Sequence, residues 1–104
     1  MCMQKKGNVT SLNGDLVVSK HFYCKEDIQI SGNLYIIDDA SFYSGNVEAD
    51  NIYIICDEDH IPTVDALSFR VHGSIISNCF DEISVNEIIS IDGPVMLYNE
   101  FYAR

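Results

Sequence analysis

The chain has 104 residues, 47% of them hydrophobic, which is the size and composition of one small folded domain. Sixteen acidic residues against six Lys and Arg give a formal net charge of −10 at pH 7. A direct nucleic-acid binder would need a basic surface, and a membrane-spanning helix would need about 20 consecutive apolar residues, so the composition argues against both classes. The N-terminal stretch MCMQKKG has no apolar segment after its lysines, which predicts a protein without a secretion signal, located in the cytoplasm.

Four cysteines are spread widely along the chain, at Cys2, Cys24, Cys56 and Cys79. None of them forms a C-x-x-C pair, so the sequence contains neither a zinc ribbon nor a thioredoxin-like motif. In a cytoplasmic protein such cysteines are expected to be reduced thiols that pack as small hydrophobic residues.

Apolar residues recur in pairs, separated by one residue, at steps of six. In chain order, the expected inward pairs are Leu16/Val18, Phe22/Cys24, Ile28/Ile30, Leu34/Ile36, Ala40/Phe42, the polar pair Asn46/Glu48, Ile52/Ile54, Phe69/Val71, Ile75/Ser77, Ile83/Val85, Ile89/Ile91 and Val95/Leu97. A helix would require a period of 3.6, whereas a short strand points two alternate side chains inward and the middle one outward. The pattern therefore predicts a series of very short strands.

A longer repeat of 18 residues contains three of these units. The similar segments GDLVV, GNLYII and DNIYII begin at Gly14, Gly32 and Asp50, and related segments begin at Gly73 and Gly93. Three strands per repeat are typical of a parallel β-helix, in which successive coils stack and hydrogen-bond to each other. We therefore predict an all-β, single-stranded parallel β-helix of four to five coils in one domain, 1–104, wound right-handed as parallel crossovers generally are. An antiparallel sandwich of short strands is the alternative.

Three departures from the repeat locate irregular segments within a β-helix core of about residues 10–97. Residues 56–66 are too long for one corner and contain Pro62, which predicts a loop extension from the third coil. A register slip near Cys79 predicts a second, smaller bulge. Residues 98–104 include three aromatic side chains, Tyr98, Phe101 and Tyr102, and are expected to fold over the open end as a C-terminal cap.

The register also predicts which side chains face outward. One face presents an apolar column to the outside, made of Val17, Tyr35, Tyr53, Ile76 and Met96. A second face is expected to present Ser11, Gln29, Arg70 and Ser90, with Val47 as an apolar exception. The apolar column has two interpretations: aromatic and β-branched residues simply favour strands, or the column is covered by a partner or by a second copy in a homodimer.

Acidic residues cluster at the corner that follows this apolar face. They are Asp38, Asp39, Asp57, Glu58, Asp59, Asp81, Glu82 and Glu100. Such a cluster is an ordinary solvated surface, a docking site for a basic protein, or a cation site, although the EF-hand pattern of calcium ligands is missing. The docking hypothesis names Asp38, Asp39, Asp57, Glu58, Asp59, Asp81 and Glu82 as partner-binding residues, with Tyr35 and Tyr53 as aromatic anchors.

Motifs for catalysis are missing. His21, His60 and His72 form neither an H-x-H nor an H-E-x-x-H motif, and no Walker A, G-x-G-x-x-G or G-x-S-x-G segment occurs. Short β-helix acyltransferases favour a small or acidic residue after the apolar one, where this chain has Val17, Tyr23, Gln29, Tyr35 and Tyr53. We therefore expect no enzymatic activity, no metal and no cofactor.

The corners Gly14-Asp15-Leu16, Gly32-Asn33-Leu34 and Gly73-Ser74-Ile75, repeated with the 18-residue coil, resemble those of bactofilins. The resemblance implies a small β-helix that polymerises end to end, although the extension and the aromatic cap would obstruct such stacking. The preferred hypothesis is an acidic binding protein, similar to an inhibitor or a nucleic-acid mimic, that engages a basic protein. A self-associating structural module is the alternative, and an acyltransferase-like enzyme a remote one.

Overall fold

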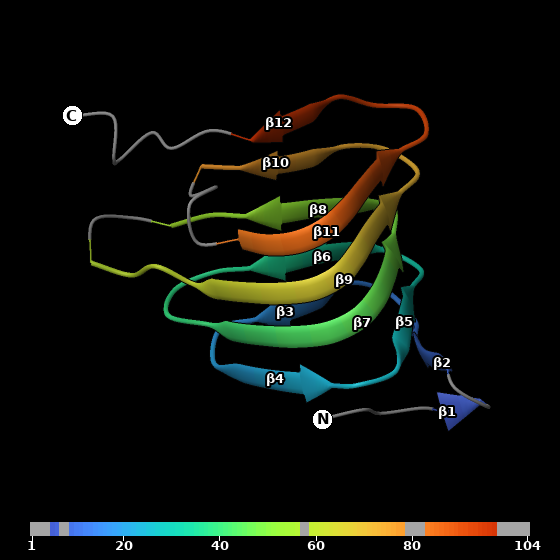
Figure 1. Ribbon diagram of the computed structural model, residues 1–104, viewed down its shortest axis with the longest axis horizontal. Coiled ribbons are helices and arrows are strands. Elements are labelled where there is room, and N and C mark those ends of the chain that lie inside the picture. Colours follow the sequence, from blue (N-terminus) through green and yellow to red (C-terminus); the bar gives the residue numbers. More distant parts are fainter. Residues whose placement is uncertain (1–4, 7–8, 57–58, 79–82, 98–104) are drawn as a thin grey trace.

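The computed structural model describes residues 5–6, 9–56, 59–78 and 83–97. The chain forms a parallel β-solenoid of about four turns with a repeat of about 19 residues, which confirms the predicted fold class (Figure 1). Its strands are β1 (Lys5–Lys6), β2 (Val9–Leu12), β3 (Leu16–Val18), β4 (His21–Cys24), β5 (Asp27–Ile30), β6 (Asn33–Ile36), β7 (Ser41–Ala49), β8 (Asn51–Ile54), β9 (Thr63–Val71), β10 (Ile75–Ser77), β11 (Ile83–Ser90) and β12 (Val95–Leu97). In this described part of the chain, no helix is long and apolar enough to span a membrane.

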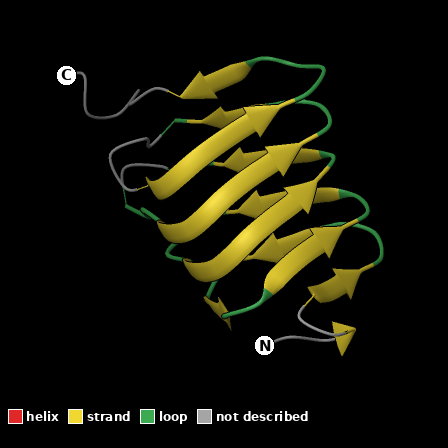
Figure 2. Ribbon diagram, turned by 45° about the vertical axis from the view of Figure 1, so that its right-hand side comes forward, coloured by secondary structure: helices red, strands yellow, loops and turns green. Residues whose placement is uncertain are grey.

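Two sheets enclose the core. The first has five parallel strands in the order β12-β10-β8-β6-β3, and the second has the order β1-β2-β5-β7-β9-β11 with β4 also paired to β7. Strands β4 and β5 both pair with β7, which is nine residues long. In the coil of β4 and β5 a bend interrupts the strand, whereas β7 continues through the equivalent bend. Figure 2 shows the stacked coils, with the antiparallel β1 pairing with β2 at the N-terminal end.

The register of the five-stranded sheet is the predicted one. Leu34 pairs with Leu16 and Ile52, and Ile75 pairs with Ile52 and Val95. Strands β3, β6, β8 and β10 therefore point the expected side chains inward, whereas Val95 in the terminal strand β12, expected inward, is 44% exposed. The 18-residue spacing of the first coils lengthens at the third coil, where the loop extension is inserted between β8 and β9.

The extension is shorter than predicted. Strand β9 begins at Thr63, and residues 63–66 pair in parallel with residues 41–44 of β7. Residues 63–66 of the predicted 56–66 extension are therefore strand, because the alternating sequence Thr63-Val64-Asp65-Ala66 buries Val64 and Ala66 in the core. The predicted bulge at residues 79–80 and the predicted cap at 98–104 lie outside the described residues.

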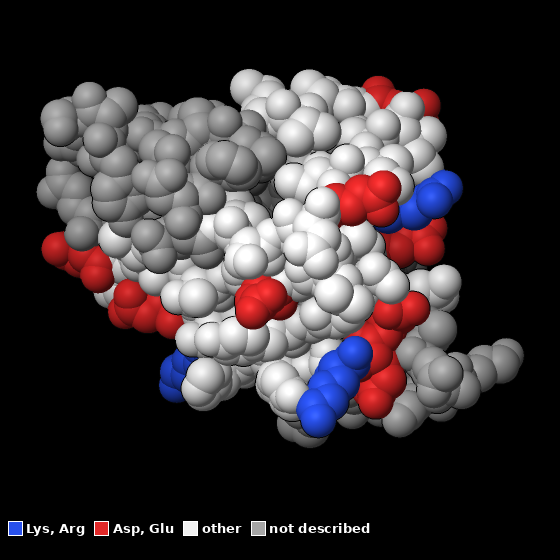
Figure 3. Space-filling view, viewed as in Figure 1, with Lys and Arg blue, Asp and Glu red and all other residues white. Residues whose placement is uncertain are grey.

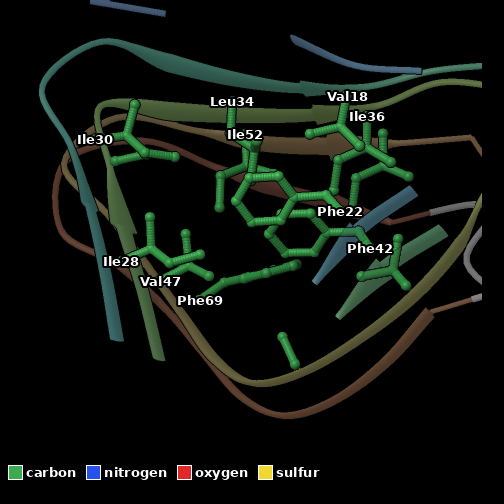
Figure 4. Packing of buried hydrophobic residues seen from close by; sticks show 14 of the residues in the cluster. Val18, Phe22, Ile28, Ile30, Leu34, Ile36, Phe42, Val47, Ile52 and Phe69 are labelled. Atoms are coloured by element: carbon green, nitrogen blue, oxygen red, sulfur yellow. The ribbon is translucent and has the colours of Figure 1, made fainter. Parts of the chain in front are cut away.

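The core is filled by side chains from both sheets. Figure 4 shows Phe22 and Phe42 side by side in its centre, with their ring centroids 5.2 Å apart and an interplanar angle of 12°. Aliphatic side chains surround these rings, and the largest fully buried residues are Phe42, Phe69, Ile28, Leu34, Ile36, Ile52, Ile54, Ile75, Val47, Val64 and Val71. Stacking equivalent residues of successive coils keeps the interior continuous along the axis.

One predicted inward pair, Asn46/Glu48, is wrong. Val47, which we expected to point outward, is 1% exposed and pairs with Ile28 and Phe69. The cause is the bend in β7. Ser44 pairs with Cys24 and Val47 pairs with Ile28 of the coil below. Ser44 and Val47 are three residues apart, whereas Cys24 and Ile28 are four residues apart. One residue fewer in the bend reverses the direction of the side chains that follow it in β7, while Ile52 and Ile54 of the next strand point inward as predicted.

A second register error affects β11. Ile88 pairs with Phe69 and packs against the core, whereas Ile89 and Ile91, predicted as an inward pair, are 36% and 47% exposed. Ser90, predicted to be outward, is half-buried and pairs with Val71. The outward column of this face is formed by Ser11, Gln29, Glu48, Arg70 and Ile89.

The Gly-Asp and Gly-Asn corners form a hydrogen-bonded ladder between coils. The Asp15 carboxylate accepts a hydrogen bond from the Asn33 backbone N–H at 2.8 Å, and the Asn51 side chain donates to Asn33 Oδ1 at 2.9 Å. Asn51 Oδ1 in turn accepts from the Ser74 N–H at 2.7 Å. The short polar side chains after the corner glycines therefore fix the stacking register of the five-stranded sheet.

Replacing Gly32 by alanine is expected to destabilise the fold by about 1–3 kcal/mol, because the added methyl group overpacks the ladder. A Cβ atom at this position would lie 2.8 Å from the backbone C and O of Gly14 in the coil below. Urea denaturation followed by circular dichroism measures the loss. Gly14→Asn is the comparison variant: no atom lies within 4 Å of its added Cβ, so any loss of stability there comes from the φ of +87° and not from overpacking. Equal stability of Gly32→Ala and the native protein would contradict this interpretation.

The cysteines do not all share one state. Cys56 is a free, buried thiol, as expected, and it is linked to the next coil because its N–H donates to Asn78 Oδ1 at 2.8 Å. The Asn78 side chain returns a hydrogen bond to the Cys56 carbonyl at 3.1 Å, which explains why this amide is buried. Cys24 is disulfide-bonded, so the prediction of a reduced thiol is wrong at this position. Cys2 and Cys79 lie outside the described residues.

Candidate docking surface

The outer side of the five-stranded sheet presents the apolar column, which consists of Val17, Tyr35, Tyr53, Ile76 and Met96. Strand pairing places these five residues next to one another in that order. Val17 is 58% exposed and Met96 46% exposed, while the three residues between them are half-buried by their neighbours. The structure therefore brings together all five residues that the sequence predicts for self-association.

The two tyrosines at the centre of the column are ordered before any partner binds. Tyr35 and Tyr53 stack with ring centroids 5.2 Å apart and an interplanar angle of 19°. The Asn33 side-chain amide donates a hydrogen bond to the Tyr35 hydroxyl at 3.3 Å. Rings held in this way lose little conformational freedom on binding, which favours their use as anchors.

Two isoleucines that we did not predict as surface residues widen the column. The amides of Ile37 and Ile55 donate to the carbonyls of Val18 and Ile36 at 3.0 Å, so the parallel pairing continues past the ends of β6 and β8. Ile55 is 40% exposed and Ile37 is half-buried. The triplet Tyr-Ile-Ile at residues 35–37 and 53–55 could have predicted these surface residues. A strand that continues one residue further turns its last isoleucine outward. We call the column together with Ile37 and Ile55 the apolar face.

Three of the predicted acidic residues are described, and they lie in exposed turns after the apolar face. Asp38 has a φ of 57°, a left-handed conformation that Asp adopts more readily than most residues. The Asp39 carboxylate accepts a hydrogen bond from the Ile61 N–H at 3.2 Å, which holds the extension beside the turn. Asp59 lies in the same extension. The local turn therefore accounts for the type of residue at Asp38 and Asp39, and their exposure leaves both able to contact a partner.

The remaining predicted acidic residues, Asp57, Glu58, Asp81, Glu82 and Glu100, lie outside the described residues. The described part of the docking surface therefore consists of the apolar face and the turns at Asp38, Asp39 and Asp59.

A groove of about 290 Å³ crosses the other sheet, on the outer side of the bend. Its outward-facing lining comprises Asp27, Gln29, Asn46, Glu48, Ser68, Arg70, Glu87 and Ile89. His72 Nε2 lies 3.0 Å from Glu48 Oε2, within hydrogen-bond distance, and the Ser68 hydroxyl donates to Asn46 Oδ1 at 2.7 Å. Figure 3 shows acidic and basic side chains next to each other on the right of this face. The predicted register missed the groove because it placed Glu48 inward.

The polar side chains in the described residues form hydrogen bonds with one another and with the backbone. Within the described ranges, no three His, Cys, Asp or Glu side chains are grouped so as to hold a metal ion. His72 contacts a carboxylate, and its neighbour in the chain, Gly73, belongs to the corner ladder.

In comparisons with known proteins, no family model matches the chain, and no curated protein or solved structure is significantly similar to it. The resemblance to bactofilins therefore stays a prediction from the repeat pattern.

Proposed function

We propose that this protein is a non-enzymatic binding protein that engages a basic protein partner through the apolar face and the acidic turns beside it. The observation that supports this proposal is the position of the exposed Asp38 and Asp39 just after the end of β6, a strand whose outer side chain, Tyr35, belongs to the apolar column. Apolar anchors surrounded by charged groups are the usual composition of a protein-binding surface.

The two parts of this surface have different roles. The stacked pair Tyr35 and Tyr53 supplies apolar area that is removed from water on binding. The exposed carboxylates, within a chain of net charge −10, attract a cationic partner and accelerate its association. A partner whose basic site normally holds phosphates would be blocked by such a surface, as expected for an inhibitor or a nucleic-acid mimic.

Self-association through the same apolar face is the second candidate. It is favoured by the continuity of the apolar column over all five strands, since an unbroken flat face can pair with its own copy. Molecular mass in solution distinguishes the candidates: light scattering over a range of concentrations gives a monomer for the binding protein and a dimer or a growing polymer for the self-associating module.

The variant Asp38→Asn/Asp39→Asn is expected to bind its partner several-fold more weakly, mainly through slower association, because exposed charges at the rim of an interface contribute modestly. The partner is captured with the native protein as bait, identified by mass spectrometry and purified, and association is then measured at low and at high salt. The variant and the native protein should converge at high salt.

The matched control is Asp65→Asn/Glu87→Gln, which removes two exposed charges from the other sheet. The control should bind as the native protein does at every salt concentration. A captured partner that is not basic, or equal losses in the variant and the control, would contradict the proposed function.

A further inference from the structure

The opposite edge of the apolar face is also acidic. Asp15 directly precedes β3, Asp50 directly precedes β8, and Asp92 lies in the turn that leads into β12; all three are exposed. Because these strands are parallel, they all begin on one side of the apolar face and all end on the opposite side, where Asp38 and Asp39 lie. We call the side where the strands begin the leading margin and the side where they end the trailing margin. Only the trailing margin is evident from the sequence, because the leading carboxylates lie one to a corner instead of forming a run.

The margins are close enough to contact one partner together. A strand of four residues, such as β8, spans about 13 Å, and the carboxylates lie just beyond its two ends. Along the solenoid axis the leading carboxylates belong to the first, third and fifth strands of the sheet, so they recur about every 10 Å. The apolar face is therefore a strip roughly one helix diameter wide, with the carboxylates of Asp15, Asp50 and Asp92 along one side and the Asp38-Asp39 turn on the other.

Few described cations offset these charges. Lys20 lies in the turn after β3 and His72 in the turn before β10. Lys5, Lys6, Lys25 and Arg70 belong to the other sheet and its corner. Both margins are thus negative apart from the trailing margin of the first coil, where Lys20 lies.

We propose that the apolar face accepts a partner that presents its own apolar strip with Lys or Arg on both sides, and that a second copy of this chain is not its occupant. The inference rests on the proposed function and specifies the partner's chemistry. Two copies placed face to face would bring an acidic margin against an acidic margin in either orientation, because both edges of the face carry carboxylates. A partner with cations on both sides instead pairs with both margins at once.

Two synthetic amphipathic helices test this inference with the full-length protein. Both have a leucine stripe; one has lysines on both sides of the stripe, and the other has lysines on one side and glutamines on the other. The two-sided peptide is expected to bind roughly three- to ten-fold more tightly at low salt, and the difference should disappear at high salt.

Three double variants, each of which removes two negative charges, distinguish the contributions of the two margins to binding. Asp15→Asn/Asp50→Asn changes the leading margin, Asp38→Asn/Asp39→Asn the trailing margin, and Asp65→Asn/Glu87→Gln the other sheet. Asparagine keeps the oxygen acceptors that Asp15 and Asp39 use in the fold. Either margin variant should bind the two-sided peptide only as tightly as the native protein binds the one-sided peptide. The one-sided peptide should be unaffected by either, because it can turn to face the remaining acidic margin.

The outcomes distinguish this inference from the proposed function. If only the trailing variant weakens the two-sided peptide, the inference is overturned and the proposed function stands. If neither margin variant differs from the control, or neither peptide binds, both are overturned. Analytical ultracentrifugation completes the test: the native protein should be monomeric at low and high salt, and a dimer that Tyr53→Lys dissociates would also overturn the inference.

Discussion

Replacing Ile54 by aspartate is expected to prevent the chain from folding. Ile54 is fully buried in β8, the middle strand of the five-stranded sheet, with parallel partners on both sides. An unpaired carboxylate at this position costs several kcal/mol, which is comparable to the whole stability of a small domain. Far-UV circular dichroism and urea denaturation measure the effect: the variant should lose the strand spectrum and show no cooperative transition.

The neighbouring residue supplies a matched control. Ile55 has the same side chain but is 40% exposed on the apolar face, so the carboxylate of Ile55→Asp stays in contact with water. That variant should fold with a stability within about 1 kcal/mol of the native protein. Comparable unfolding of both variants, or cooperative folding of both, would contradict the inside–outside assignment of this strand.

Truncation of Phe42 to alanine is expected to lower the free energy of unfolding by about 3–5 kcal/mol. Phe42 is fully buried, and its ring stacks on Phe22 at 5.2 Å between the two sheets. Removing the ring leaves a cavity that the stacked coils cannot collapse to fill, because each coil is hydrogen-bonded to the coils above and below. The urea midpoint should fall while the slope of the transition stays the same.

The control for this prediction is Tyr43→Ala in the same strand. Tyr43 is half-buried on the outer side, and its ring contacts Tyr23 with a centroid distance of 6.3 Å. Its loss should cost about 1 kcal/mol or less. A larger loss for Tyr43→Ala than for Phe42→Ala would place the core on the wrong side of β7.

The sequence predicted the pairing register of the five-stranded sheet and the buried pairs of β6, β8 and β10. Its strands contain isolated inward pairs such as Leu34/Ile36, and the first three follow the similar corners Gly14-Asp15, Gly32-Asn33 and Asp50-Asn51 at a spacing of 18 residues. The hydrogen bonds of Asp15, Asn33 and Asn51 show why those corners hold the register.

The bend of the other sheet could not be predicted from a fixed step of six. In β7 the chain turns within a continuous strand, and one residue fewer between Ser44 and Val47 shifts the later positions. The apolar alternation of Val47 and Ala49 was the available signal, and the strict repeat overrode it. In β11 the adjacent residues Ile88 and Ile89 place an apolar side chain on each side of the strand. Only the pairing of Ile88 with Phe69 decides which isoleucine faces inward.

The candidate docking surface was predicted in part. The five residues of the apolar column follow from the register, whereas Ile37, Ile55 and the leading margin depend on where each strand begins and ends. Such ends are set by backbone hydrogen bonds, for example from Ile55 N–H to the Ile36 carbonyl, which hydrophobic alternation does not show.

The most direct test of the docking surface is a nuclear magnetic resonance titration of the isotope-labelled protein with the two-sided peptide. Shifts of the backbone amide signals should concentrate in residues 15–19, 33–39 and 50–55, on the outer side and edges of the five-stranded sheet. Shifts confined to the groove around Gln29, Glu48 and Arg70, with the apolar face unchanged, would contradict the account.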